Sequence, residues 1–244
     1  MILRRFHTFN TFLKEKPVNL KNMKHSSQLW LTRQMKDPYV ELAKQQNYRC
    51  RSAFKLLELN KRYKIFEPGM NVVDCGAAPG SWTQVAVNLT NANGKMVDEQ
   101  KGKVIAIDKL PMHHVDGAIV YGNMDFTLEK SKQIILDSLQ GKFVELVMSD
   151  MAPNSSGVKE LDHENIIRLA YMTLHFALKA TTFEGTLIVK LWDGSRSSEF
   201  EENVAKFYRK VNIVRPQATR SESSEKFILA RGFKGIQIRA TENK

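Results

Sequence analysis

Cysteine is scarce in this chain of 244 residues, where it occurs only as Cys50 and Cys75. Two cysteines cannot form the disulfide framework of a small secreted domain, and these two lack the spacing of a metal-binding pair. We therefore expect a reducing compartment and expect both to be small core residues. Long apolar runs are missing too. No stretch approaches the roughly 18 uninterrupted apolar residues of a membrane-spanning helix, which argues against a membrane protein.

Acidic residues are rare in the first part of the chain. Residues 1–55 contain 12 basic and 3 acidic residues, a net charge of +9, so the total of +11 leaves +2 for all the others. A local excess of positive charge is typical of nucleic-acid binding, of a targeting peptide, or of both. The length suits one α/β domain with a short extension rather than two full domains.

The first residues, MILRRFHTFNTFLKEKP, contain no acid before Glu15 and interleave basic with apolar side chains. This pattern is typical of a mitochondrial transit peptide, and a disordered basic tail that binds RNA is the alternative. We assign residues 1–28 to such a transit peptide or disordered segment, and residues 29–240 to the folded domain.

The body of the chain alternates short apolar runs with amphipathic runs, which predicts a mostly parallel sheet with helices on both faces. Two helices are expected between Trp30 and Tyr63, the first with Pro38 near its start and the second from Arg51. A short strand should end at Asp74. The further strands are expected at 103–108, 118–121, 143–150, 186–192, 211–215 and 225–233, and the further helices at about 82–89, 128–139, 162–180 and 199–210.

A loop of small residues, Gly76 to Trp82, follows the first strand, and ligands of an open parallel sheet bind beyond the carboxyl ends of its strands. The glycines fit neither G-x-G-x-x-G nor the P-loop, which disfavours a nicotinamide-dependent oxidoreductase. Asp108 and Asp125 follow the next two strands, where they can accept hydrogen bonds from ribose hydroxyls and an adenine amino group. This layout predicts an S-adenosylmethionine site. The alternative is that both aspartates only cap helices or turns.

Longer segments carry a more specific resemblance: YRCRSAFKL, VVDCGAAPGSWTQ, IDKLP, MSDMAPN, LIVKLW and SSEKFILA. Taken in this order, between about Trp30 and Phe233, they resemble the FtsJ (RrmJ) family of RNA ribose 2′-O-methyltransferases. WLTRQMKDPYVELAKQQNYRCRSAFKL and RSESSE look most like the mitochondrial branch, which methylates a uridine of the large-subunit ribosomal RNA. The resemblance implies a Rossmann-like methyltransferase fold with a C-terminal antiparallel strand and S-adenosylmethionine as methyl donor, without a metal.

The resemblance also implies site residues. The catalytic tetrad of the family, Lys-Asp-Lys-Glu, falls on Lys55, Asp150, Lys190 and Glu225. The cofactor residues implied are Gly76, Pro79, Gly80, Ser81, Trp82, Asp108, Asp125 and Asp150. Ser81 stands where many relatives have glycine or alanine, a small departure that should leave binding intact.

In this family Lys190 is the expected acceptor of the ribose 2′-hydroxyl proton. A free lysine has a pKa of about 10.4 and is mostly protonated at neutral pH. Burial and a neighbouring Lys55 disfavour the ammonium form, whereas Asp150 and Glu225 favour it, so literal general-base action and simple positioning both stay open. His113, His114 and His163 lack metal-ligand spacing and are expected on the surface.

Ribosomal RNA should lie along the basic helices before the core, with Lys44, Arg49 and Arg51 as phosphate contacts. The alternative for each is a solvated helix face. We expect the RNA to be part of the assembling mitochondrial large subunit, in the matrix, and a monomer would suffice. Two other functions stay open: the same chemistry on another RNA, such as transfer RNA, and an assembly factor in which RNA binding matters more than methylation.

Overall fold

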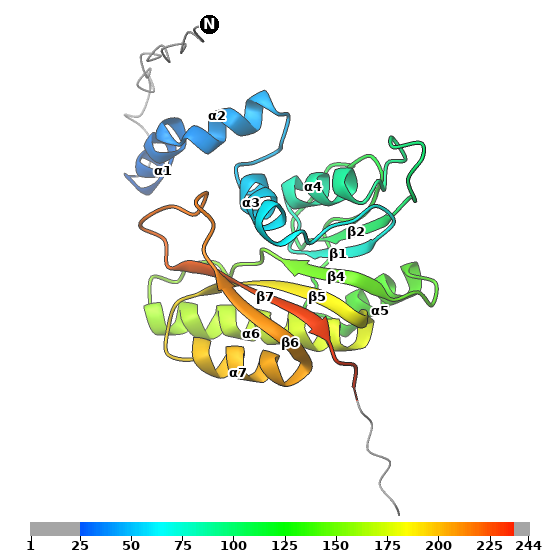
Figure 1. Cartoon of the computed structure of the whole chain (residues 1–244). Coiled ribbons are helices and arrows are strands. Elements are labelled where there is room, and N and C mark those ends of the chain that lie inside the picture. The colour runs from blue at the N-terminus through cyan, green and yellow to red at the C-terminus, as the bar shows by residue number, and fades with distance from the viewer. Residues whose placement is uncertain (1–24, 237–244) are drawn as a thin grey trace, which may run out of the picture.

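Seven strands form one sheet in the order β3-β2-β1-β4-β5-β7-β6 in the computed structural model, which describes residues 25–236 (Figure 1). Neighbouring strands from β3 to β5 are parallel, and β7 is antiparallel to both β5 and β6. The predicted fold class is therefore confirmed, including the reversed strand near the C-terminus. The strands are β1 (Asn71–Cys75), β2 (Lys103–Ile107), β3 (Ala118–Tyr121), β4 (Val144–Ser149), β5 (Thr181–Trp192), β6 (Tyr208–Val214) and β7 (Glu225–Phe233).

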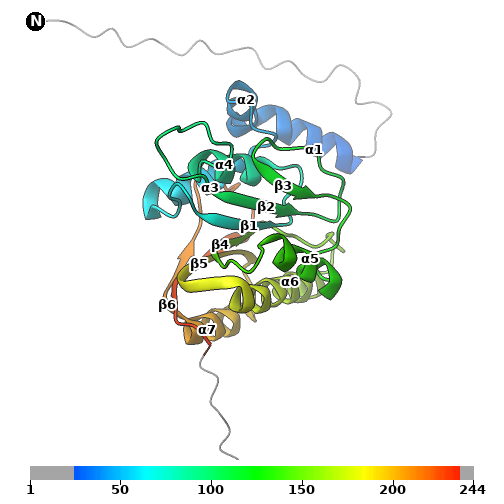
Figure 2. The same cartoon turned by 90° about the vertical axis from the view of Figure 1, so that its right-hand side faces the viewer.

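Helices cover both faces of the sheet, as Figures 1 and 2 show. Two apolar cores result, because successive strand residues point to opposite faces. Val72 of β1 packs on the side of α3 and α4, and Val73 packs on the side of α5, α6 and α7. These helices are α3 (Ala53–Tyr63), α4 (Ser81–Leu89), α5 (Glu129–Ser138), α6 (Lys159–Ala180) and α7 (Ser197–Phe207). No helix of the described part is long and apolar enough to span a membrane.

The region before α3 differs from the prediction of two helices between Trp30 and Tyr63. It contains α1 (His25–Lys36) and α2 (Pro38–Gln45), so the structure has three helices up to Tyr63. The break falls at Asp37, whose carboxylate caps α2 by accepting a hydrogen bond from the backbone of Tyr39 (3.1 Å). Proline at the first position of α2 lacks the N–H that would continue α1. The predicted transit peptide lies mostly outside the described residues, and its last residues belong to α1.

Strand β5 begins earlier than the predicted start at Thr186. Thr181 already pairs with Val144, and Thr186 pairs with Leu146, so residues 182–185 form a bulge opposite a single β4 residue. Glu184 in the bulge has a positive φ of 64°. Its conformation breaks the apolar alternation, which explains why the sequence pattern indicated only the second half of the strand.

Candidate active site

Several of the predicted site residues lie beyond the carboxyl ends of the parallel strands. The loop after β1 turns sharply there, and Gly76 (φ 75°) and Gly80 (φ 111°) adopt backbone conformations that other residues rarely adopt. A Cβ on Gly76 would collide with Met151, and one on Gly80 with Arg49. Both glycines thus allow the loop to lie against its neighbours.

A cavity of about 270 Å³ opens beside this loop. Its walls come from the ends of β1, β2 and β4 and from the segment after β3, and they include Gly76, Asp108, Asp125, Asp150 and Asn154. Four of these five were predicted from the sequence as cofactor residues. Three carboxylates in one small cavity favour a ligand that carries positive charge and hydroxyl or amino donors.

Asp108 and Asp125 each have a structural role as well as a place in this cavity. Asp108 accepts backbone hydrogen bonds from Ala78 (2.9 Å) and Leu110 (2.7 Å). Asp125 accepts one from the backbone N–H of Thr127 (2.8 Å), which is the main reason that its pKa lies below the usual value. The two readings left open by the sequence are therefore compatible, since each carboxylate holds a turn and still lines the cavity.

Four other predicted cofactor residues, Pro79, Gly80, Ser81 and Trp82, are not part of this cavity wall. Trp82 is buried in the core, where its indole N–H donates to the carbonyl of Ser52 (2.9 Å). Ser81 is also buried, and its hydroxyl contacts the thiol of Cys50 at 3.0 Å. Cys50 is only half-buried and so is not the core residue that we expected, whereas Cys75 is buried as expected. Contact of these four residues with a cofactor stays a prediction.

The four tetrad residues form two adjacent ion pairs. Lys55 at the start of α3 contacts both oxygens of Glu225, the first residue of β7, at 2.7 and 2.8 Å. Lys190 of β5 donates to the Asp150 carboxylate at 2.8 Å and also to the Asp150 carbonyl. Both lysines are 8% exposed. Residues from four separate elements thus place two ammonium and two carboxylate groups together, largely out of water.

The electrostatics of Asp150 link the two pairs. Burial alone would raise the pKa of Asp150, but the ammonium group of Lys190 and, after it, that of Lys55 outweigh burial and hold the pKa below its usual value. Both lysines therefore act on the same carboxylate, although only Lys190 contacts it. Asp150 is ionised at neutral pH as a result.

Asp74 is a buried carboxyl group that the sequence analysis did not single out. Burial raises its pKa to about 7, against the effect of the hydrogen bond from Thr83, and the charges of Asp150 and Asp108 raise it further. One of its oxygens has no hydrogen-bond partner in the described structure. The available signal was an acidic residue at the end of an otherwise apolar strand, NVVDC.

The three residues predicted to contact RNA differ in their surroundings. Lys44 is exposed and forms an ion pair with Glu41 at 2.8 Å. The guanidinium of Arg51 contacts Asp37 at 2.7 Å, and that of Arg49 donates to backbone carbonyls of Pro79, His113 and His114. Both arginines therefore connect loops within the molecule, and RNA contact of all three stays a prediction.

His163 is buried, contrary to the expected surface position, whereas His113 and His114 are exposed. Its Nε2 accepts the backbone N–H of Arg196 (3.1 Å), and its ring lies against Gly194, so it holds the loop after β5. The burial of His163 could not be predicted from the sequence, because a histidine near the start of an amphipathic helix does not indicate this tertiary contact. Within residues 25–236 no group of three or more His, Cys, Asp and Glu side chains could hold a metal ion.

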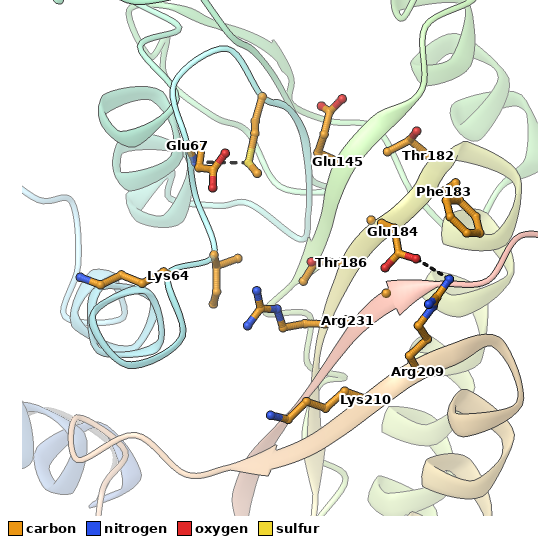
Figure 3. A pocket seen from close by; sticks show the side chains of 14 residues that line it. Lys64, Glu67, Glu145, Thr182, Phe183, Glu184, Thr186, Arg209, Lys210 and Arg231 are labelled. Atoms are coloured by element: carbon orange, nitrogen blue, oxygen red, sulfur yellow. Dashed lines mark hydrogen bonds and ion pairs between the residues drawn. The ribbon is translucent and has the colours of Figure 1, made fainter.

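A larger cavity, of about 460 Å³, lies at the opposite end of the sheet (Figure 3). It is bordered by charged side chains of both signs, among them Lys64, Glu145, Lys210 and Arg231, and by the bulge of β5. Arg209 holds Glu184 of that bulge at 2.6 Å. None of the predicted site residues lies there.

The parallel sheet with one reversed strand, and a carboxylate-lined cavity at the turn after β1, define a Rossmann-like fold with a cavity at the place where such sheets bind ligands. Residues 48–233 match the family model of FtsJ-like methyltransferases. The chain belongs to the FtsJ-like methyltransferase family. The predicted resemblance is thereby confirmed.

Known relatives cover nearly the whole chain. It is 50% identical over 224 residues to "rRNA methyltransferase 2, mitochondrial" of Drosophila melanogaster, covering 92% of this chain and 90% of the relative. It is 41% identical over 223 residues to "Ribosomal RNA large subunit methyltransferase E" of Ruegeria pomeroyi, covering 91% and 95%. A crystal structure of a putative ribosomal RNA methyltransferase from Plasmodium falciparum is 26% identical, with a TM-score of 0.68, and covers 78% of this chain and 100% of that one.

Proposed function

We propose that this protein transfers a methyl group from S-adenosylmethionine to the ribose 2′-oxygen of a uridine in mitochondrial large-subunit ribosomal RNA. The observation that carries the proposal is the Lys190–Asp150 pair, because Asp150 both lines the cavity and holds the lysine. The names of the relatives support ribosomal RNA as the substrate and, for the relative from Drosophila, the mitochondrion as the location.

The cavity residues fit S-adenosylmethionine. Asp108 and Asp125 have free acceptor capacity for ribose hydroxyls and for an adenine amino group, and Asp150 offers negative charge for a sulfonium. Gly76 has no side chain, so Met151 can pack closely against this loop at the cavity wall. When bound, the cofactor supplies a methyl carbon that is already activated by the positive sulfur.

Lys190 is placed to receive the proton of the 2′-hydroxyl. A neutral amine keeps two N–H bonds, and Lys190 can donate these to the carboxylate and the carbonyl of Asp150. Its lone pair would then be left to accept the proton of the hydroxyl. Asp150 therefore orients the amine in both protonation states.

Lys55 and Glu225 contribute a second, internally neutral pair. Lys55 helps to keep Asp150 ionised, and Glu225 holds Lys55 in place. We include Lys44, Arg49 and Arg51 as RNA contacts, of which Lys44 has the most exposed charge. We also include import through the N-terminal basic segment and action on the assembling subunit.

The test is transfer of a labelled methyl group from S-adenosylmethionine to mitochondrial large-subunit ribosomal RNA, offered free and as an immature subunit, with Lys190→Ala as the control. We expect label on a uridine 2′-oxygen, and none with the variant. No label on either substrate, from protein that binds S-adenosylmethionine, would reject this substrate and favour another RNA. Rescue of subunit assembly in cells by Lys190→Ala would instead favour an assembly factor.

A further inference from the structure

The loop between β6 and β7 (215–224) leads directly into Glu225 of the tetrad and is held from within. One guanidinium nitrogen of Arg215 donates to the backbone carbonyls of Arg220, Ser221 and Ser223 at 3.2, 3.1 and 2.6 Å. Three carbonyls converging on one cation fix the path of the second half of the loop. Hydrogen bonds to a cation, and not packing alone, therefore fix the conformation of this part of the loop.

Helix α3 holds the first half of the same loop. The carboxylate of Glu58 accepts the backbone N–H groups of Gln217 (2.6 Å) and Ala218 (3.1 Å). Arg51 donates to the carbonyl of Ala218 at 2.6 Å, and Ala218 itself is fully buried against Ala43 and Phe54. Figure 1 shows the loop reaching up to the N-terminal helices. These contacts determine where the next residue, Thr219, must lie.

Thr219 contacts the tetrad directly. Its hydroxyl donates to Oε1 of Glu225 at 3.0 Å, its backbone N–H donates to the carbonyl of Pro216 at 2.9 Å, and it is 8% exposed. Lys55 contacts both oxygens of the same carboxylate. Rotation about the last bond of a glutamate side chain is loosely restricted, so such an additional hydrogen bond decides the orientation of the carboxylate.

The orientation matters because Lys55 lies near enough to a second carboxylate, that of Asp150, for its charge to act on it. Lys55 already acts on the charge of Asp150, so a Lys55 released by Glu225 would compete with Lys190 for that carboxylate. We propose that Thr219 is a positioning residue that keeps Lys55 on Glu225 and thereby leaves Asp150 to Lys190. This inference rests on the proposed function, because it concerns the tetrad of the same reaction.

The first test compares Thr219→Val, which removes the hydroxyl at nearly constant shape, with Thr219→Ser, which keeps it. We expect Thr219→Val to lower kcat for RNA methylation about tenfold, as loss of a hydrogen bond to a charged group implies. The KM for S-adenosylmethionine should stay the same, and Thr219→Ser should restore most of kcat. Thr173→Val is the matched control, because Thr173 is fully buried and its hydroxyl donates only to a helix carbonyl.

The second test repeats Thr219→Val in a Lys55→Ala background. If Thr219 acts through Lys55, the valine variant has no further effect there, whereas a merely structural role would lower kcat in both backgrounds. The inference is overturned if Thr219→Val has the same kcat as the wild type, or if it lowers kcat equally in both backgrounds. Both outcomes assume that the wild-type protein methylates RNA. Should Thr219→Val lose its melting transition, Thr219→Ala is measured in its place. Absence of methylation by the wild type would instead count against the proposed function.

Discussion

Charged side chains gather at both ends of the sheet. They are nearly buried at the carboxyl ends of the parallel strands and largely exposed at the amino ends. At the carboxyl ends the tetrad is nearly buried, its charges pair within the protein, and one of its members, Asp150, lines a cavity of about 270 Å³. At the amino ends the cavity is larger, about 460 Å³, but the Arg209–Glu184 pair is 57% and 50% exposed. Burial of charge is costly and is common where it serves binding or chemistry, so buried charge favours the carboxyl ends as the candidate site although the cavity there is smaller.

The difference arises from the topology. The parallel strands of a sheet all end on the same side. The loops that follow them therefore lie close together there and can form one site. The reversed β7 adds Glu225 to this edge, because its first residue lies beside the last residues of β5, with Glu225 paired to Trp192. At the other edge β7 ends instead, and its Arg231 faces the open cavity.

Replacing Lys190 should have the largest effect on both activity and stability. Lys190→Met removes the proton acceptor and leaves Asp150 as a buried charge without its main partner. We expect kcat to fall by about 10²- to 10⁴-fold and the free energy of unfolding to drop by about 3–5 kcal/mol. Methyl transfer and chemical denaturation measure the two effects. A stable variant that retained more than a tenth of the activity would contradict the role of Lys190.

Asp74 should make the carboxyl end sensitive to pH. Its pKa is about 7 in the folded protein and about 3.9 in an unfolded chain. Between these values the folded state binds the proton more tightly, so this group makes the free energy of unfolding fall as the pH rises from about 4 to 7, by up to about 4 kcal/mol.

Asp74→Asn should flatten that dependence, because an amide does not ionise, while its oxygen can still accept the hydrogen bond from Thr83. Urea denaturation of both proteins at several pH values measures the effect. Parallel curves for the two proteins between pH 4 and 7 would show that Asp74 does not hold its proton.

Asp108 tests the binding function of the same end. Asp108→Ala should weaken S-adenosylmethionine binding by about 10- to 100-fold, because it removes a charged acceptor and releases two backbone N–H groups that hold the loops. Calorimetric titration without RNA measures the affinity. Asp116→Ala, which removes an exposed carboxylate, is the control and should bind normally. Equal affinities of the two variants would remove Asp108 from the cofactor site.

The smallest effect is expected at the amino end. Arg209→Ala and Glu184→Ala each break an exposed ion pair, which should cost about 0.5 kcal/mol or less and leave kcat and both KM values unchanged. Thermal melting and the methyl-transfer assay check this. A clear rise in the KM for RNA with either variant would contradict this expectation and would indicate that the larger cavity takes part in RNA binding.

Sequence patterns predicted most of the fold because its central strands are buried on both faces and most of its strands are separated by amphipathic helices. They failed where a tertiary contact or a local break overrides periodicity. The expected helix near Pro38 is α2, but the separate helix α1 before Asp37 was not predicted, and the Glu184 bulge hides the first half of β5. His163 looked like a surface residue because nothing near it in sequence indicates that the loop after β5 covers it.

The sequence by itself indicated the order of the elements from α2 onward and the glycine turn after β1, because these depend on local periodicity or on contiguous motifs. The four tetrad residues are predicted from the resemblance of their motifs to the FtsJ family. Only the tertiary structure decided which lysine pairs with which carboxylate, since Lys55 and Glu225 are 170 residues apart and Asp150 and Lys190 are 40 apart. It also decided that Arg49 and Arg51 hold loops together, and that Thr219 reaches Glu225. The physical reason is that charge pairing depends on distance in space and on burial, neither of which a linear pattern records.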